Sequence, residues 1–254
     1  MDDSTPTGAA LAALLSGDAP LFPELDAARR DLAALRASPR MAALLPRTAP
    51  RLASLDALPR TTYSRYQAFR RTGDREPYET PYFRKREHLH AAALHLFLGR
   101  EDLRDAVQDA LWDICDESTW VIPAHARVID LMAAETGLGL AEVLALIGDR
   151  LDGEVRHRVR GAIDRRLFAP FLHSQYDLRW FNGDDNWNGV CAGALGATFL
   201  HLERDPDRLT RAIELVLESL RTFPATAFAE DGSSSEGVGY WHYGLTHVIV
   251  FAEM

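Results

Sequence analysis

Cysteine is scarce in this chain. Only Cys115 and Cys191 occur among its 254 residues, both in helix-like apolar surroundings. Neither has a CxxC partner or the spacing of metal ligands, so we expect two buried thiols outside any disulfide, in a reducing compartment. Neither a metal site nor a cofactor is predicted.

Export and membrane signals are also missing. The chain begins with the acidic residues Asp2 and Asp3, where a secretory signal would carry Lys or Arg. Its early apolar run, Ala9–Leu15, is too short to cross a bilayer. We therefore expect a cytoplasmic protein with no membrane partner.

The net charge and the absence of several catalytic motifs exclude further classes of protein. Acidic residues outnumber basic ones by 37 to 28, giving a net charge of −9, which disfavours nucleic acid and anionic membranes as partners. The chain has no Gly-rich phosphate loop, HExxH helix or GxSxG elbow. Kinases, zinc proteases and serine hydrolases are thereby excluded.

Helical periodicity dominates what is present, and alternating strand patterns are nearly absent. Apolar residues repeat at helical spacing over 89–97, 103–114 and 209–217, and Asp152–Phe168 forms another amphipathic segment. Asp205 and Pro206 begin the 209–217 helix with a capping acid and a proline at its first position. The pattern predicts an all-α fold of stacked helical hairpins.

The first part of the chain differs from the rest. Short helices are expected between Ala9 and Leu45, and the prolines after them make Pro46–Thr62 a candidate linker. We therefore divide the chain into an N-terminal helical segment with linker, 1–60, and a core, 61–254. Within the core, small residues crowd Gly189–Ala197, as in an inner helix that neighbours approach closely. Such layers suggest an (α/α) toroid or solenoid.

Two polar and aromatic blocks stand out in the last quarter. In Asn186–Cys191, Asn186 and Asn188 flank Trp187 at an expected helix start, where exposed N–H groups favour a carboxylate. Capping of the helix by one Asn accounts for the pair equally well. The second block, 231–244, combines glycines with Glu236, Tyr240, Trp241, His242 and Tyr243.

These blocks contain the groups of a carbohydrate cleft, in which indole faces stack on sugar rings. If the second block is helical, Tyr240 and Tyr243 share a face from which His242 points away. Further indoles lie in 120–125 and 180–185, and we take Trp120, His125 and Trp180 as additional substrate-binding candidates. Core packing is the alternative for each aromatic residue taken singly.

Several ordered blocks resemble the heparinase II/III-like polysaccharide lyases. They are 115–125 (CDESTWVIPAH), 134–137 (AETG), 186–191 (NWNGVC) and 239–244 (GYWHYG), and the likeness runs from about Tyr82 to the end. The resemblance implies β-elimination on uronic-acid glycans, with an (α/α) toroid followed by a β-sandwich domain.

The resemblance also implies site roles. An asparagine, Asn186 or Asn188, would neutralise the uronate carboxylate, and Tyr240 would be the tyrosine acid and also a candidate base. The separation of Asn186 from Tyr240 favours that pair over Asn188 with Tyr243. A tyrosine base at neutral pH needs its pKa lowered by about 3 units, and His242 is a candidate cation for this.

The chain stops at Met254 inside an apolar run without a terminating cap. We therefore expect an incomplete toroid without the β-sandwich, open to self-association and a weak lyase or none by itself. The expected partner is an anionic oligosaccharide or polysaccharide. Two alternatives stay open: an (α/α) glycoside hydrolase using carboxylates such as Asp185 and Glu236, and a non-catalytic carbohydrate-binding module.

Overall fold

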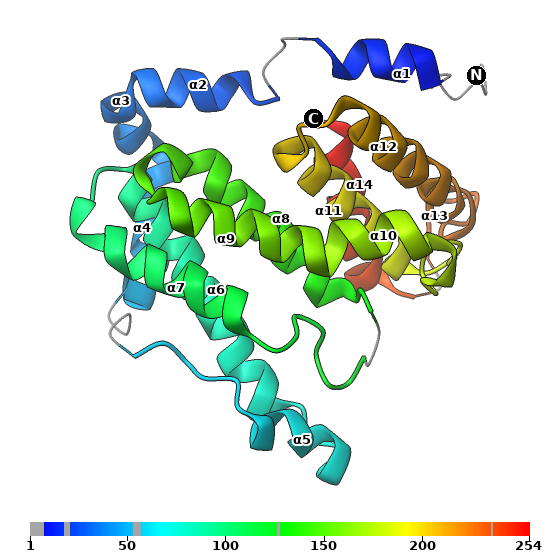
Figure 1. Ribbon diagram of the computed structural model, residues 1–254, viewed down its shortest axis with the longest axis horizontal. Helices are drawn as coiled ribbons and strands as arrows, with labels where there is room; N and C mark the ends of the chain where they lie inside the picture. Colours follow the sequence, from blue (N-terminus) through cyan, green and yellow to red (C-terminus); the bar gives the residue numbers. More distant parts are fainter. Residues whose placement is uncertain (1–7, 18–20, 53–56, 126–127, 235) are drawn as a thin grey trace. The chain divides into compact units, whose positions relative to one another are not determined.

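The computed structural model describes residues 8–17, 21–52, 57–125, 128–234 and 236–254. Throughout these ranges the regular elements are helices, and no strand occurs (Figure 1). The predicted all-α class is confirmed. It follows from the 3.6-residue apolar period, which buries a stripe of each helix against its neighbours.

The chain forms two compact units. Unit 1 comprises residues 1–21, 128–138 and 164–254, and unit 2 comprises residues 22–127 and 139–163. Helix α8 (Leu131–Ile147) contributes its first half to unit 1 and its second half to unit 2. Residues on both sides of position 60 belong to unit 2, and the division into domains at that position stays a prediction.

Unit 2 is arranged around α6. Its helices are α2 (Pro23–Arg30), α3 (Leu32–Ala37), α4 (Pro39–Leu52), α5 (Tyr63–Thr72), α6 (Glu76–Phe97), η1 (Glu101–Leu103), α7 (Arg104–Asp116), η2 (Gly148–Arg150) and α9 (Gly153–Ile163). Helix α6 packs against α4, α5 and α7, and α7 packs against α9. The two predicted stripes are buried, with Leu96 on α6 and Leu111 on α7 both 0% exposed.

The predicted linker is partly wrong. Helix α4 continues through Pro46 and Pro50 to Leu52, so residues 46–52 are helical. Each proline removes one backbone donor from the helix, but the remaining bonds keep it intact over 14 residues. Residues 53–56 lie outside the described ranges, and Leu58–Thr62 follows without regular structure.

Unit 1 is arranged around α11. Its elements are α1 (Gly8–Leu15), the π-helical turn η3 (Asp164–Phe168), α10 (Ala169–Ser174), η4 (Gln175–Asp177), α11 (Asn186–Leu202), α12 (Pro206–Leu220), α13 (Thr222–Thr226) and α14 (Val238–Ala252). Helices α12, α13 and α14 pack against α11, and α1 packs against α12 (Figure 1). As predicted, Asp205 caps α12, because its side chain accepts a hydrogen bond from the Arg208 N–H.

The small residues of α11 allow α14 to approach its backbone. A methyl group at Gly193 would lie 2.5 Å from the carbonyl oxygen of His247, and one at Gly189 would lie 3.0 Å from that of Gly244. Both distances are shorter than normal carbon–oxygen contacts, so these positions require glycine. The predicted close approach of helices at the Gly189–Ala197 run is confirmed.

One segment of the described chain, 131–150, is long and apolar enough to cross a membrane. Of its most apolar window, 72% is buried inside the structure. A core helix has this combination of length and burial, and we interpret α8 in that way.

Candidate functional site

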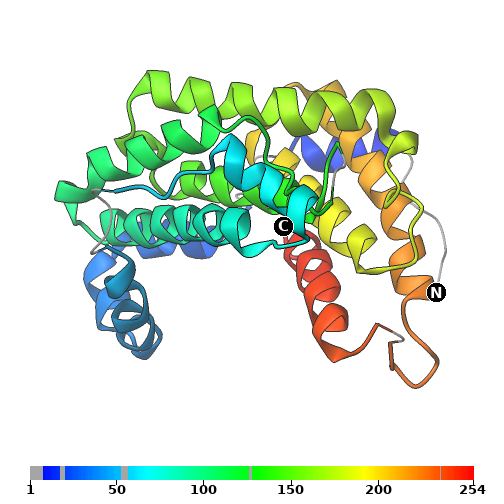
Figure 2. The ribbon, with the colours of Figure 1, turned by 90° about the horizontal axis from the view of Figure 1, so that it is seen from below.

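The two blocks of the last quarter meet at the first turn of α11. The long connection from α13 leads into α14, whose start follows Gly237 at a φ of 85° (Figure 2). From this connection, the Glu236 carboxylate accepts a hydrogen bond of 2.7 Å from the backbone N–H of Asn186. The sequence predicted that both blocks would contribute to one site, and this contact joins them across 50 residues.

Asn186 is the first residue of α11 and lies where the two blocks meet. The residue is only 2% exposed. Its Nδ2 is buried, yet among the described residues no acceptor bonds to it. Leaving a buried amide donor unsatisfied costs about 1–3 kcal/mol, so this N–H group is a candidate for a hydrogen bond to a bound ligand.

Asn188, by contrast, is a structural residue. It is 0% exposed, and its Nδ2 lies 3.0 Å from the carbonyl oxygens of both Trp180 and Phe181. It also lies 2.9 Å from the hydroxyl of Ser219. These contacts tie the loop before α11 and the end of α12 to the helix. We therefore remove Asn188 from the candidate substrate residues.

The start of α11 already holds two carboxylates. Asp185, rather than an asparagine, is the N-cap, and its side chain accepts from the Trp187 N–H at 3.2 Å. Glu236 occupies the neighbouring Asn186 N–H. The prediction that a substrate carboxylate docks at the bare helix end is therefore corrected: these N–H groups are taken by protein carboxylates, and the free donor is the Asn186 side chain.

Tyr240 and His242 lie on the first turns of α14 and are both solvent-exposed, Tyr240 by 58%. Gly244, four residues after Tyr240 and therefore on the same side of the helix, packs against Asn186: a methyl group there would lie 3.3 Å from the Asn186 Cβ. Tyr240 thus begins the stripe of α14 that borders Asn186. His242 is two residues on, about 200° around the helix, and does not share that stripe.

Tyr243 belongs to a second polar group, formed with Glu135 of α8 and His247 of α14. The His247 ring lies edge-on to the Tyr243 ring at 5.3 Å, and its Nε2 is 3.4 Å from a Glu135 carboxylate oxygen. Burial and the nearby Glu135 charge raise the pKa of Tyr243 above its ordinary value. A tyrosine base needs the opposite shift, so the raised pKa keeps the Tyr243 hydroxyl protonated and disfavours it as the base.

Sequence reasoning did not assign site roles to Glu135 or His247. The spacing of Tyr243 and His247 places them on one side of α14, which is a signal available in the sequence. Glu135 could not be linked to them, because only the packing of α8 in unit 1 brings its carboxylate to His247.

The four predicted indoles separate into two kinds. Trp120 and Trp180 are each 2% exposed, and their Nε1 groups donate to the carbonyl oxygens of Ile114 and Ile129. No indole face is left for a sugar ring, so we assign both to the core. Trp187 and Trp241 are partly exposed, and the Trp241 ring contacts Phe228 edge-on at 6.3 Å. Only this second pair keeps the predicted substrate-binding role.

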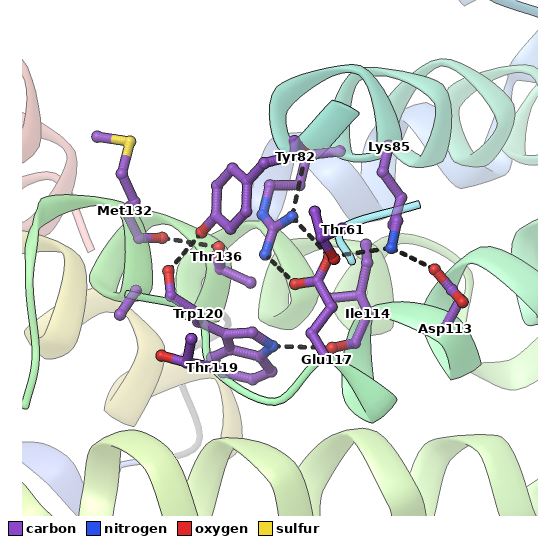
Figure 3. Close-up of polar contacts among 12 residues, drawn as sticks. Thr61, Tyr82, Lys85, Asp113, Ile114, Glu117, Thr119, Trp120, Met132 and Thr136 are labelled. Atoms are coloured by element: carbon purple, nitrogen blue, oxygen red, sulfur yellow. Dashed lines mark hydrogen bonds and ion pairs between the residues drawn. The ribbon is translucent and has the colours of Figure 1, made fainter. Parts of the chain in front are cut away.

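The block 115–125 is built around a buried ion cluster in unit 2 (Figure 3). Glu117 accepts from Lys85 at 3.0 Å and from Arg86 at 2.7 Å, with its side chain 2% exposed. The Tyr82 hydroxyl donates to the Trp120 carbonyl oxygen at 2.7 Å. Every charge here has a partner of opposite sign, so we interpret the cluster as structural. His125 follows it, partly buried, and its substrate-binding role stays a prediction.

Both cysteines are buried and outside any disulfide, as predicted. Burial raises the pKa of the Cys191 thiol well above its usual range, which keeps it protonated and unreactive. In the described ranges, no group of three or more His, Cys, Asp or Glu side chains could hold a metal ion.

Comparison of the chain with protein-family models and with curated proteins gives no match.

Proposed function

We propose that this chain is the helical, toroid-type part of a lyase that cleaves uronic-acid glycans by β-elimination. The observation that supports the proposal is the buried Asn186 amide, whose Nδ2 has no acceptor among the described residues. An amide donor of this kind suits the uronate carboxylate, whose charge must be neutralised before the C5 proton becomes acidic.

In the proposed reaction, a base removes the C5 proton, and the electron pair of the broken C5–H bond forms the C4–C5 double bond. The bond between C4 and the glycosidic oxygen breaks, and that oxygen takes a proton from the Tyr240 hydroxyl. Tyr240 starts the stripe of α14 that reaches Asn186 at Gly244. His242 faces another direction, so we do not pair it with Tyr240 in this step.

The exposure of Tyr240 bears on the expected rate. The side chain is 58% exposed, and water around it screens its electrostatic interactions with a bound substrate. We therefore expect slow turnover by this chain, with Tyr240 as the acid.

The test uses the purified chain with uronate oligosaccharides, and follows the ultraviolet absorbance of the unsaturated product. We expect Tyr240→Phe and Asn186→Ala to lose that absorbance. Tyr63→Phe is the matched control, because Tyr63 is 74% exposed and lies in unit 2. Absorbance that persists in Tyr240→Phe, or a wild-type chain that forms no product, overturns the proposal.

The same assay separates the two alternatives. A glycoside hydrolase would give new reducing ends without absorbance, and a binding module would bind the glycan without cleaving it. The hydrolase needs two carboxylates on opposite sides of the scissile bond. Asp185 and Glu236 instead accept from adjacent N–H groups of one helix end, which favours the lyase.

A further inference from the structure

Unit 2 contains a surface pocket with a volume of about 550 Å³. It lies beside the first turns of α5 and α6, and its lining includes three arginines, Arg60, Arg65 and Arg84. A volume of this size is within the usual range of small-molecule sites, about 300–1,000 Å³. It shares no residue with the Asn186 site.

The three pocket arginines differ from some other arginines of unit 2, which form ion pairs with carboxylates. Arg75 pairs with Glu79 at 2.6 Å and Arg51 with Glu87 at 3.1 Å. For Arg60, Arg65 and Arg84, no ion pair occurs within the described part of the chain. Arg65 makes one hydrogen bond, of 3.3 Å to the carbonyl oxygen of Arg60. With Asp74 and Glu76 also in the lining, the pocket carries three positive and two negative side chains, a net charge of +1 in a chain whose net charge is −9.

The other polar residues that line the pocket are acidic or neutral. Asp74, Glu76 and Thr80 also face the pocket. One Asp74 oxygen accepts from the Glu76 N–H at 3.0 Å, which leaves the rest of both carboxylates exposed to the pocket. A compact inorganic anion would be repelled by these carboxylates. A sugar, however, carries hydroxyl groups that donate to carboxylates as well as an acidic group that accepts from arginines.

We propose that this pocket binds an acidic sugar unit, in which a carboxylate or a sulfate group accepts hydrogen bonds from the arginines. Guanidinium groups bind both oxyanions through paired N–H donors, and Asp74, Glu76 and Thr80 bind the ring hydroxyls. The site recognises an anionic glycan through residues separate from those of the proposed elimination. It therefore does not depend on whether the chain is a lyase.

The experiment measures binding to the full chain by calorimetry with three disaccharides of equal size: a uronate, a sulfated and a neutral one. We expect the neutral sugar to bind at least about tenfold more weakly than one of the acidic sugars, because charge-assisted hydrogen bonds are lost. The better of the two acidic ligands identifies the oxyanion. The double variant Arg65→Gln/Arg84→Gln should lose that preference.

Arg71→Gln is the matched control, since Arg71 is an exposed α5 residue that does not line the pocket. It should bind as the wild type does, and thermal unfolding should show that all variants are folded. Three results overturn the proposal: equal affinity in the double variant, tighter binding of inorganic sulfate or a short oligonucleotide than of any disaccharide, or no acidic preference. Loss of elimination in Tyr240→Phe leaves this binding unchanged, so the two proposals fail separately.

Discussion

Two buried polar groups of this molecule differ in how completely their hydrogen bonds are satisfied. In unit 2, Glu117 pairs with Lys85 at 3.0 Å and with Arg86 at 2.7 Å, and Lys85 also pairs with Asp113. In unit 1, Asn186 buries an amide donor that has no acceptor among the described residues. Burial alone therefore does not mark a functional residue. A satisfied group holds the fold together, whereas an unsatisfied one is available to a ligand.

The largest effect is expected in the ion cluster of unit 2, whose charges are paired. Glu117→Gln removes the buried charge that pairs with both Lys85 and Arg86, and only the Lys85–Asp113 ion pair of the cluster remains, so the free energy of unfolding should fall by about 3–5 kcal/mol. Urea denaturation measures the loss. Glu87→Gln is the control, because that carboxylate is 49% exposed in its pair with Arg51 and should matter by less than about 1 kcal/mol. Equal losses would contradict a structural role for Glu117.

The next prediction compares the variants Asn188→Ala and Asn186→Ala, which both delete an asparagine side-chain amide. Asn188→Ala should lower the free energy of unfolding by about 1–3 kcal/mol, since it leaves buried acceptors unpaired. Asn186→Ala should not lower it, and should raise it if the unsatisfied donor is costly, because the deleted amide N–H is buried and has no described partner. Chemical denaturation of both variants gives the comparison. A similar loss in both would show that Asn186 is structural, and would remove the main support for the lyase proposal.

A smaller effect concerns Tyr78, which borders the ion cluster. Burial and the Glu117 charge raise the pKa of Tyr78 to about 12. Because the unfolded chain releases this proton near pH 10, the stability that Tyr78 contributes is present below pH 10 and lost as the pH rises towards 12. Tyr78→Phe should reduce that loss by on the order of 1 kcal/mol, after screening by water. Unfolding measured from pH 9 to 12 tests this, with Tyr63→Phe, at an exposed site, expected to have no effect.

The last prediction concerns Glu236→Gln, for which the effect on stability should also be small. The amide oxygen can still accept from the Asn186 N–H, so the free energy of unfolding should change by less than about 1 kcal/mol. Removal of the negative charge beside Asn186 should strengthen uronate binding and leave the binding of a neutral sugar unchanged. Calorimetry measures both affinities. Weaker uronate binding would instead assign Glu236 to the substrate contacts, as the sequence predicted.

Local sequence patterns were sufficient to predict several of the helices. The stripes over 89–97 and 103–114 became α6 and α7, and Asp205 with Pro206 began α12 as expected. Such features depend on residues three or four positions apart, whose proximity is fixed by helix geometry itself. The glycines of α11 were also informative, because only small residues allow backbones to approach so closely.

The division of roles within the candidate site could not be predicted. The sequence presents Asn186 and Asn188 alike, yet the fold satisfies the amide donor of Asn188 and leaves that of Asn186 without an acceptor among the described residues. It also presents Trp120 and Trp180 as candidate sugar platforms, whereas packing buries both.

The sequence by itself thus determined an all-helical chain with a small-residue inner helix and two polar blocks near its end. Tertiary structure decided which polar atoms of those blocks have hydrogen-bond partners within the protein. Glu236 reaches Asn186 across 50 residues, and Glu135 reaches His247 from another helix. Hydrogen-bond satisfaction is a property of such long-range contacts, and no local period in the sequence encodes it.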